Sequence, residues 1–254
     1  MDINRVFAGI DLSTSRHGLT VALLTPRLDV RSLKRQSLDE ALGELAECPQ
    51  ITAAIGGPMR PCVPFAEPDP PAEGVRRKGN PRRARAADGE LSRRGISVRR
   101  PPDRASDAPA WMRCGFDLAR ELADRGFAEG KDAGAEPRVL LEAPPMACAS
   151  VLLGRLAYAR ETLEGRIQRQ LILLRERVAL PDPMDALEEL TAHHILSGRM
   201  ELKGILGAGE LDALLAAFTA WRAYTHPEAV SWLGDDADGW ICLPGKELLG
   251  KYQK

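Results

Sequence analysis

The first fifty-five residues constrain the fold more than any other part of the chain, because short apolar runs alternate there with turns. The apolar runs occupy residues 6–11, 19–24 and 28–33. Short polar or Thr-Pro segments separate them, which predicts an antiparallel meander of three strands. Ser37 and Glu40 form a capping box that predicts a helix over 38–46, and a fourth strand is expected at 51–55. This order indicates a mixed sheet and not the βαβαβ start of a Rossmann fold.

A Pro/Arg-rich insertion over residues 59–109 follows the fourth strand. Between Arg76 and Arg104, eleven Arg or Lys residues face three acids, a local charge of +8 in a chain whose net charge is -1. Hydrophobic periodicity nearly vanishes, so we expect irregular structure with a short helix at 85–94. Such a segment is typical of a solvated loop or of a phosphate-binding surface. The basic stretch from Arg76 to Arg104 lacks aromatic residues, which argues against base stacking within it.

Regular hydrophobic periodicity returns after the insertion, and most of the elements that it predicts are helices. Helices are predicted at about 111–126, 163–177, 183–197 and 210–224, and strands at 139–142 and 239–243. The last helix is apolar almost all round, so it should be buried. A chain of 254 residues can bury a substantial core, and we interpret 1–254 as a single domain.

The composition favours a cytoplasmic protein without a membrane partner. The first residues lack the basic-then-apolar pattern of a signal peptide, and no apolar stretch is long enough to span a bilayer. The five cysteines are widely spaced and form no CxxC pair, so neither a zinc site nor a disulfide framework is indicated. The sequence leaves the oligomeric state open.

Three acids stand at positions where they could share one cleft. Asp11 ends the first strand, Glu142 ends the strand at 139–142, and Asp212 lies in the first turn of the last helix. Each has an ordinary alternative: an Asx turn, a solvent-facing acid, or a complement to the helix dipole. In a mixed sheet they can converge, and clustered carboxylates suit Mg²⁺ or Mn²⁺, which bind phosphate oxygens.

Several blocks of the chain together resemble a known family. They are Val6–Asp11, Arg85–Ile96, Trp111–Gly115, Val139–Pro144, Glu164–Arg169 with Leu173 and Leu174, Leu211–Ala217 and Gly239–Pro244. In this order they resemble domain-of-unknown-function family 429, described as predicted RNase H-like nucleases and related to the Holliday-junction resolvase superfamily.

The resemblance implies an α/β fold with an RNase H-like mixed sheet flanked by helices. At matching positions it implies Asp11, Glu142 and Asp212 as catalytic, metal-binding acids. It also implies Arg85, Arg166 and Arg169 as nucleic-acid contacts, for which surface ion pairs are the alternative.

Two positions depart from the family pattern. Relatives end the fourth strand with Ile-Asp-x-Pro, where this chain has Gly56, and often carry a second Asp where Gly209 stands. Losing these acids could remove one metal site.

Three hypotheses about function therefore remain. The first is a metal-dependent nuclease that acts on DNA or RNA, and the second is a non-catalytic nucleic-acid- or protein-binding module on the same scaffold. The third is an ATP-dependent phosphotransferase, suggested by the phosphate-loop-like segment at 9–15 but lacking a second Gly-Asp-Gly block.

Overall fold

The computed structural model describes residues 4–12, 18–62, 84–131, 136–188, 191–198 and 202–254. One eight-stranded mixed sheet forms its centre, with the strand order β3-β2-β1-β4-β6-β8-β7 and β5 paired beside β6. Its strands are β1 Val6–Asp11, β2 Leu19–Leu24, β3 Val30–Gln36, β4 Ile51–Ile55, β5 Ala128–Glu129, β6 Arg138–Glu142, β7 Ser231–Asp235 and β8 Gly239–Leu243. The helices are α1 Leu38–Glu47, α2 Ala86–Arg93, α3 Ala110–Asp124, α4 Pro145–Leu153, α5 Leu163–Arg175, α6 Pro183–Glu188, α7 Ala192–Leu196 and α8 Ala208–Thr225. An α/β protein with helices on both faces of a mixed sheet is therefore confirmed.

The predicted meander is present at one end of the sheet. β1 pairs antiparallel with β2, and β2 pairs antiparallel with β3. β4, β6 and β8 then run parallel to β1. β1, β2 and β4 are buried along their whole length, as strands covered on both faces must be.

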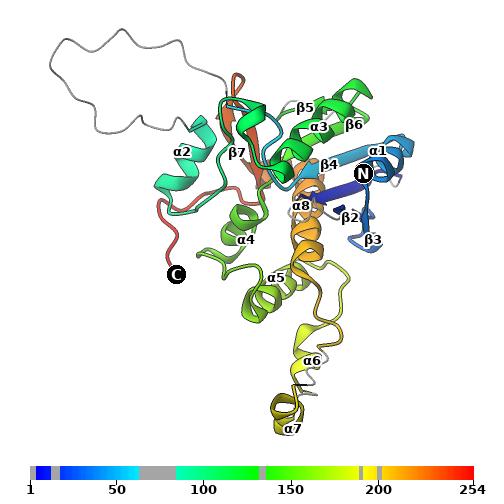
Figure 1. Ribbon diagram of the computed structural model, residues 1–254, viewed down its shortest axis with the longest axis vertical. Helices are drawn as coiled ribbons and strands as arrows, with labels where there is room; N and C mark the ends of the chain where they lie inside the picture. Colours follow the sequence, from blue (N-terminus) through cyan, green and yellow to red (C-terminus); the bar gives the residue numbers. More distant parts are fainter. Residues whose placement is uncertain (1–3, 13–17, 63–83, 132–135, 189–190, 199–201) are drawn as a thin grey trace, which may run out of the picture.

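Helices cover both faces of this sheet (Figure 1). One apolar cluster joins α1 and α3 to residues such as Ile10 and Ile55, and a second joins α4, α5 and α8 to the opposite face. The capping box at Ser37 is formed as expected, with Glu40 bonding back to the cap. α8 packs across β1, β2 and β4 and is buried almost all round.

Several expectations from the sequence need correction. The helix predicted over 183–197 is two short helices, α6 and α7, which project from the body in Figure 1. Helix α4 and strands β5 and β7 were not expected at all. Of the Pro/Arg-rich insertion, residues 63–83 lie outside the described part, and α2 confirms the short helix predicted near 85–94.

Within the described chain, no helix is both long and apolar enough to cross a bilayer.

Gly9 allows the close approach of β1 and α8. A Cβ atom at this position would lie 2.0 Å from the carbonyl oxygen of Ala213 and 2.2 Å from the backbone nitrogen of Ala217. Both are backbone atoms of α8, so neither can move aside as a side chain would. Only glycine lets this strand and this helix pack at the observed distance.

We therefore expect Gly9→Ala to lower the free energy of unfolding by about 3 kcal/mol or more, the upper range for overpacking a core. Gly43→Ala is the matched control, because a Cβ there meets nothing within 4 Å on helix α1. It should raise the free energy of unfolding by about 0.5–1 kcal/mol, since Gly is a poor helix residue. Urea denaturation of both variants measures this, and losses of similar size would contradict the packing argument.

Candidate functional site

Strand register decides how the predicted acids are arranged. Ile10, Ile55 and Glu142 are aligned across the parallel strands β1, β4 and β6. Side chains of residues aligned on neighbouring parallel strands point to the same face of the sheet, and side chains of successive residues in one strand point to opposite faces. Glu142 therefore points to the face of Ile10, whereas Asp11 points with Gly9 to the face covered by α8. The two acids end their strands at one edge of the sheet but belong to different faces.

The first ion-pair cluster joins Asp11 to α8. Nη1 of Arg160 lies 3.3 Å from Oδ1 of Asp11 and 2.8 Å from Oδ2 of Asp212. Arg169, on α5, contacts the other oxygen of Asp212 at 3.2 Å. Both acids are buried, and the Arg160 side chain is 24% exposed. Because α8 begins at Ala208, Asp212 lies in its second turn and not its first.

The second cluster holds Glu142. The guanidinium of Arg85 donates to both carboxylate oxygens of Glu142, at 2.7 and 2.6 Å, and to both oxygens of Asp88, at 3.0 and 3.1 Å. The backbone N–H of Met59 adds a bond to Glu142 at 3.3 Å. All three charged side chains are at least 97% buried. Such a fully paired network fixes α2 against the end of β6.

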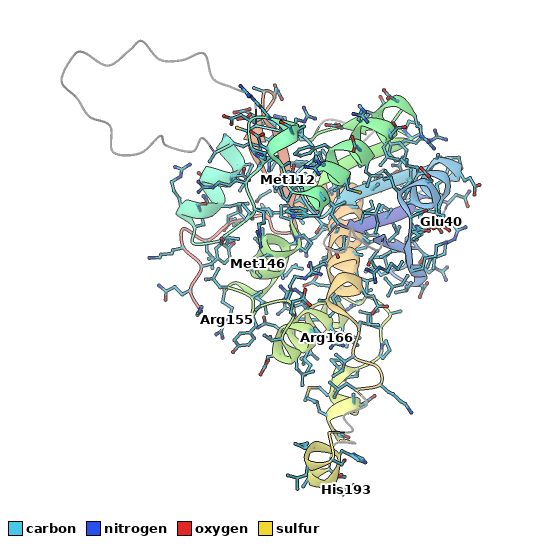
Figure 2. The ribbon with its side chains drawn as sticks, in the orientation of Figure 1. Glu40, Met112, Met146, Arg155, Arg166 and His193 are labelled. Carbon is cyan, nitrogen blue, oxygen red and sulfur yellow. The ribbon has the colours of Figure 1, made fainter. Side chains whose placement is uncertain are left out.

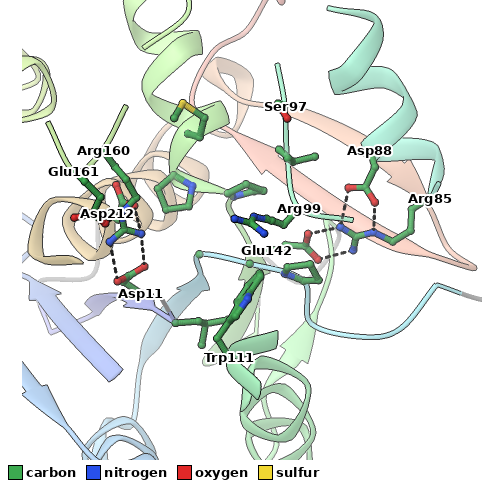
Figure 3. Close-up of a pocket in the computed structure, with 18 residues that line it drawn as sticks. Asp11, Arg85, Asp88, Ser97, Arg99, Trp111, Glu142, Arg160, Glu161 and Asp212 are labelled. Atoms are coloured by element: carbon green, nitrogen blue, oxygen red, sulfur yellow. Dashed lines mark hydrogen bonds and ion pairs between the residues drawn. The ribbon is translucent and has the colours of Figure 1, made fainter. Parts of the chain in front are cut away.

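Both clusters border one pocket with a volume of about 550 Å³ (Figure 3). Its charged lining consists of Asp11, Asp88, Glu142, Glu161, Asp212, Arg85, Arg99 and Arg160. Figure 3 shows the two clusters on opposite sides, with Arg99 and Trp111 between them. Five acids face three arginines, so even with Arg169 behind Asp212 the negative charge is in excess. Glu161 and Arg99 are exposed, and among the other groups the four buried acids still outnumber Arg85, Arg160 and Arg169. This excess of negative charge favours binding of a further cation.

The pKa of Asp212 is raised to about 6. Burial is the main cause, and the charge of Asp11 adds to it, while Arg160 and Arg169 oppose the rise. Burial lowers the pKa of Arg169, whereas the pKa of Arg160 is raised because its acidic neighbours outweigh its burial. The cluster therefore holds a carboxylate that is only partly compensated.

This raised pKa predicts a pH dependence of stability. A carboxyl whose pKa is about 6 when folded and near its ordinary 3.8 when unfolded binds more protons in the folded state between those values. Its contribution to stability is complete below about pH 4 and is lost as the pH rises through 6. Asp212→Asn cannot titrate. The stability of the wild type relative to this variant should thus fall by on the order of 3 kcal/mol between about pH 4 and pH 7.5.

Chemical denaturation at several pH values, with wild type and Asp212→Asn side by side, measures that difference. Asp117→Asn is the control, because Asp117 is about half exposed on α3 and pairs with Arg120. A constant difference between wild type and Asp212→Asn across this range would mean that Asp212 is well compensated.

Arg85 is the cation on which the second cluster depends. Burial alone would lower its pKa, but its pairs with Glu142 and Asp88 raise it overall. Arg85→Met would leave two buried acids without their partner, so we expect a loss of about 3–5 kcal/mol in the free energy of unfolding. Arg93→Met, on the exposed face of the same helix, should change it by less than about 0.5 kcal/mol. Thermal and urea unfolding measure both, and a small effect of Arg85→Met would show that Glu142 is hydrated.

The carboxylates of the pocket are its candidate metal ligands. Among the described residues, no three His, Cys, Asp or Glu side chains lie together so as to hold a metal ion. Mg²⁺, however, is commonly held by one or two carboxylates with several waters. Asp11 and Asp212 supply two such carboxylates, which both contact Nη1 of Arg160. The donor set fits a hydrated Mg²⁺ or Mn²⁺ on this pair, while a role for Glu142 as third ligand stays a prediction.

Two of the three predicted nucleic-acid contacts lie away from the pocket lining. Arg166, seen on α5 in Figure 2, donates to the carbonyls of Leu206 and Ile205 at 2.7 and 2.9 Å. Arg169 is fully buried and donates to two carbonyls besides its contact with Asp212. Arg85 lines the pocket but is occupied by its two acids. A nucleic-acid contact by these arginines stays a prediction, and their observed contacts position the site.

Sequence reasoning missed several residues of the pocket. Arg160 lies in the segment between α4 and α5, outside any predicted element, and no spacing in the sequence marks it as a partner of Asp11. Asp88 lies within the block Arg85–Ile96 that resembles the family. Arg99 and Trp111 lie in or beside the insertion, and only the fold brings them to the carboxyl ends of β1 and β6.

The two glycines that replace acids of the family pattern both border the site. A Cβ on Gly209 would lie 3.0 Å from Oδ2 of Asp11 and 3.2 Å from Oγ1 of Thr20, both atoms of side chains. A Cβ on Gly56 would lie 3.0 Å from the carbonyl oxygen of Ile10, a backbone atom. Both positions are tight, but at position 209 the crowding atoms belong to side chains that can shift, whereas at position 56 the nearest atom belongs to the backbone of β1.

The fold and site define an α/β protein with an acidic, arginine-paired pocket at the carboxyl edge of a mixed sheet. The family model described as "Protein of unknown function (DUF429)" matches residues 9–238, so the chain belongs to that family. Comparisons with curated proteins and with solved structures give no match.

Proposed function

We propose that the protein is an RNase H-like, Mg²⁺- or Mn²⁺-dependent nuclease that hydrolyses phosphodiester bonds of nucleic acid. The observation that carries the proposal is the pairing of Asp11 with Asp212 around Arg160, at the wall of a pocket with excess negative charge. The strand order supports an RNase H-like fold: an antiparallel three-strand meander, then parallel strands, with acids on the first strand and the last long helix.

Asp11 and Asp212 would hold the metal, and Arg160 would be displaced from between them toward the substrate phosphate. When bound, the metal would supply a water acidified enough to attack phosphorus and a positive charge beside the leaving oxygen. Arg160 is suited to this exchange, because its side chain is partly exposed and it comes from a segment between helices. A guanidinium released from its acids can then pair with phosphate in a bidentate way.

The experiment compares cleavage of labelled single-stranded, duplex and branched DNA and RNA, with and without Mn²⁺ or Mg²⁺. We expect metal-dependent cleavage by the wild type, and loss of about a hundredfold or more in Asp11→Asn, because one of two metal ligands is gone. Asp117→Asn, a surface acid variant, should cleave as the wild type does. Cleavage that survives in Asp11→Asn would exclude this site as the source.

Metal binding is measured separately from activity. Mn²⁺ should raise the melting temperature of the wild type, since a ligand that binds the folded state stabilises it, and should leave that of Asp11→Asn unchanged. An equal shift in both proteins would place the metal elsewhere.

Gly209→Asp tests whether the missing acid limits the metal site. In EDTA the new charge beside Asp11 should lower the melting temperature, because like charges repel. With Mn²⁺, the stabilisation should exceed that of the wild type by about 1.4 kcal/mol if affinity rises tenfold. Gly43→Asp, which adds the same charge on α1 where a Cβ meets nothing within 4 Å, is the control. If both variants respond to Mn²⁺ alike, position 209 does not face a metal.

A second function is favoured by a specific observation. Arginines already pair with all three predicted acids, and glycines stand at the two further positions. We therefore also propose, as the alternative, a non-catalytic nucleic-acid-binding module. It would show salt-sensitive binding without cleavage on any of the substrates above.

A further inference from the structure

The pocket has a second half that metal chemistry does not use. Besides the ion-pair clusters, its wall is formed by apolar side chains that include Leu12, Pro58, Val98 and Pro145, with the ring of Trp111 between the clusters (Figure 3). A volume of about 550 Å³ is within the range of small-molecule pockets. An apolar wall beside a few polar groups is typical of sites that bind small molecules.

Trp111 is placed as a platform in this cavity. It is partly buried, and its ring lies against the end of β4, where a Cβ on Gly57 would come within 3.2 Å of Cζ3. Its indole N–H has no hydrogen-bond partner among the described residues. By contrast, Trp221 donates to the carbonyl of Pro26 and Trp240 donates to Asp236. The Trp111 ring is thus held by packing while its N–H is unused.

Arg99 supplies a cation in the same cavity. Arg85 and Arg160 are paired with acids, whereas Arg99 lines the pocket, is exposed, and has no ion pair with any residue that the structure describes. Ser97 adds a hydroxyl on the same rim. An aromatic ring beside an uncommitted guanidinium is the combination that binds a base and the phosphate next to it.

We propose that this half of the pocket binds one unpaired nucleotide, with its base stacked on Trp111 and its phosphate on Arg99. This rests on the proposed function, because it places the scissile strand beside Asp11 and Asp212, and it names the substrate class. A base inside a duplex is stacked on both sides and offers no free face to the ring. The substrates are therefore single strands, loops or frayed ends, and not intact duplex.

The test is fluorescence anisotropy with three labelled DNA probes of equal length, in Ca²⁺ and without cleavage: a single strand, the same strand with abasic sites, and a blunt duplex. The wild type should bind the single strand about tenfold more tightly than the abasic strand, which keeps the phosphates but lacks the bases. Trp111→Ala should remove that difference, and Trp111→Phe should keep most of it. Arg99→Gln should weaken both single strands, whereas Arg100→Gln, its exposed neighbour, should change neither by more than about twofold.

The comparison of the first two probes uses the wild type alone, so it remains decisive even if Trp111→Ala does not fold. Equal affinities for the abasic and intact strands, or for the duplex, would overturn the inference while leaving metal-dependent cleavage intact. Base-dependent binding without cleavage would support the inference and count against the nuclease.

Discussion

The approach of β1 to α8 at Gly9 is the constraint on which the site depends. Because no side chain separates the strand from the helix, the carboxyl end of β1 and the second turn of α8 lie side by side. Asp11 and Asp212 then meet at a single guanidinium. A helix held a few ångströms farther away would leave the two acids as separate surface groups. The packing of small residues, Gly9 against Ala213 and Ala217, thereby sets the electrostatics of the pocket.

Arginines hold the acids in two separate groups. Burying a carboxylate is costly unless a cation accompanies it, and Arg85 and Arg160 supply that charge. The two differ in a way that matters for function. Arg85 is wholly buried between Glu142 and Asp88, while Arg160 is partly exposed and bridges acids of two elements. The first network is closed to solvent, whereas the second is partly open to it.

Much of the fold was predictable because its signals are local. Apolar runs and a capping box are read within a few residues, so the meander, α1, β4 and α8 follow from the sequence. Each of β5 and β7 pairs with the next strand in the chain, but neither has a clear pattern of its own. β5 has only two residues, and β7 contains Gly234 and Asp235 and is half-buried along its length. α4 begins at the second proline of a Pro-Pro pair and is apolar on nearly all sides, so no 3.6-residue period marks it.

The sequence by itself determined which acids end at the carboxyl edge of the sheet, since Asp11 and Glu142 close apolar strands and Asp212 lies near the start of a buried helix. Tertiary structure decided which of them meet. Parallel register aligns Ile10 with Glu142, so alternation turns Asp11 toward α8 and Glu142 toward Arg85. The tertiary structure also brought Arg160, Arg99 and Trp111 to the pocket, although no hydrophobic period in the sequence marks these residues. Contacts between residues far apart in the chain leave no local trace, and for that reason only the folded chain specifies them.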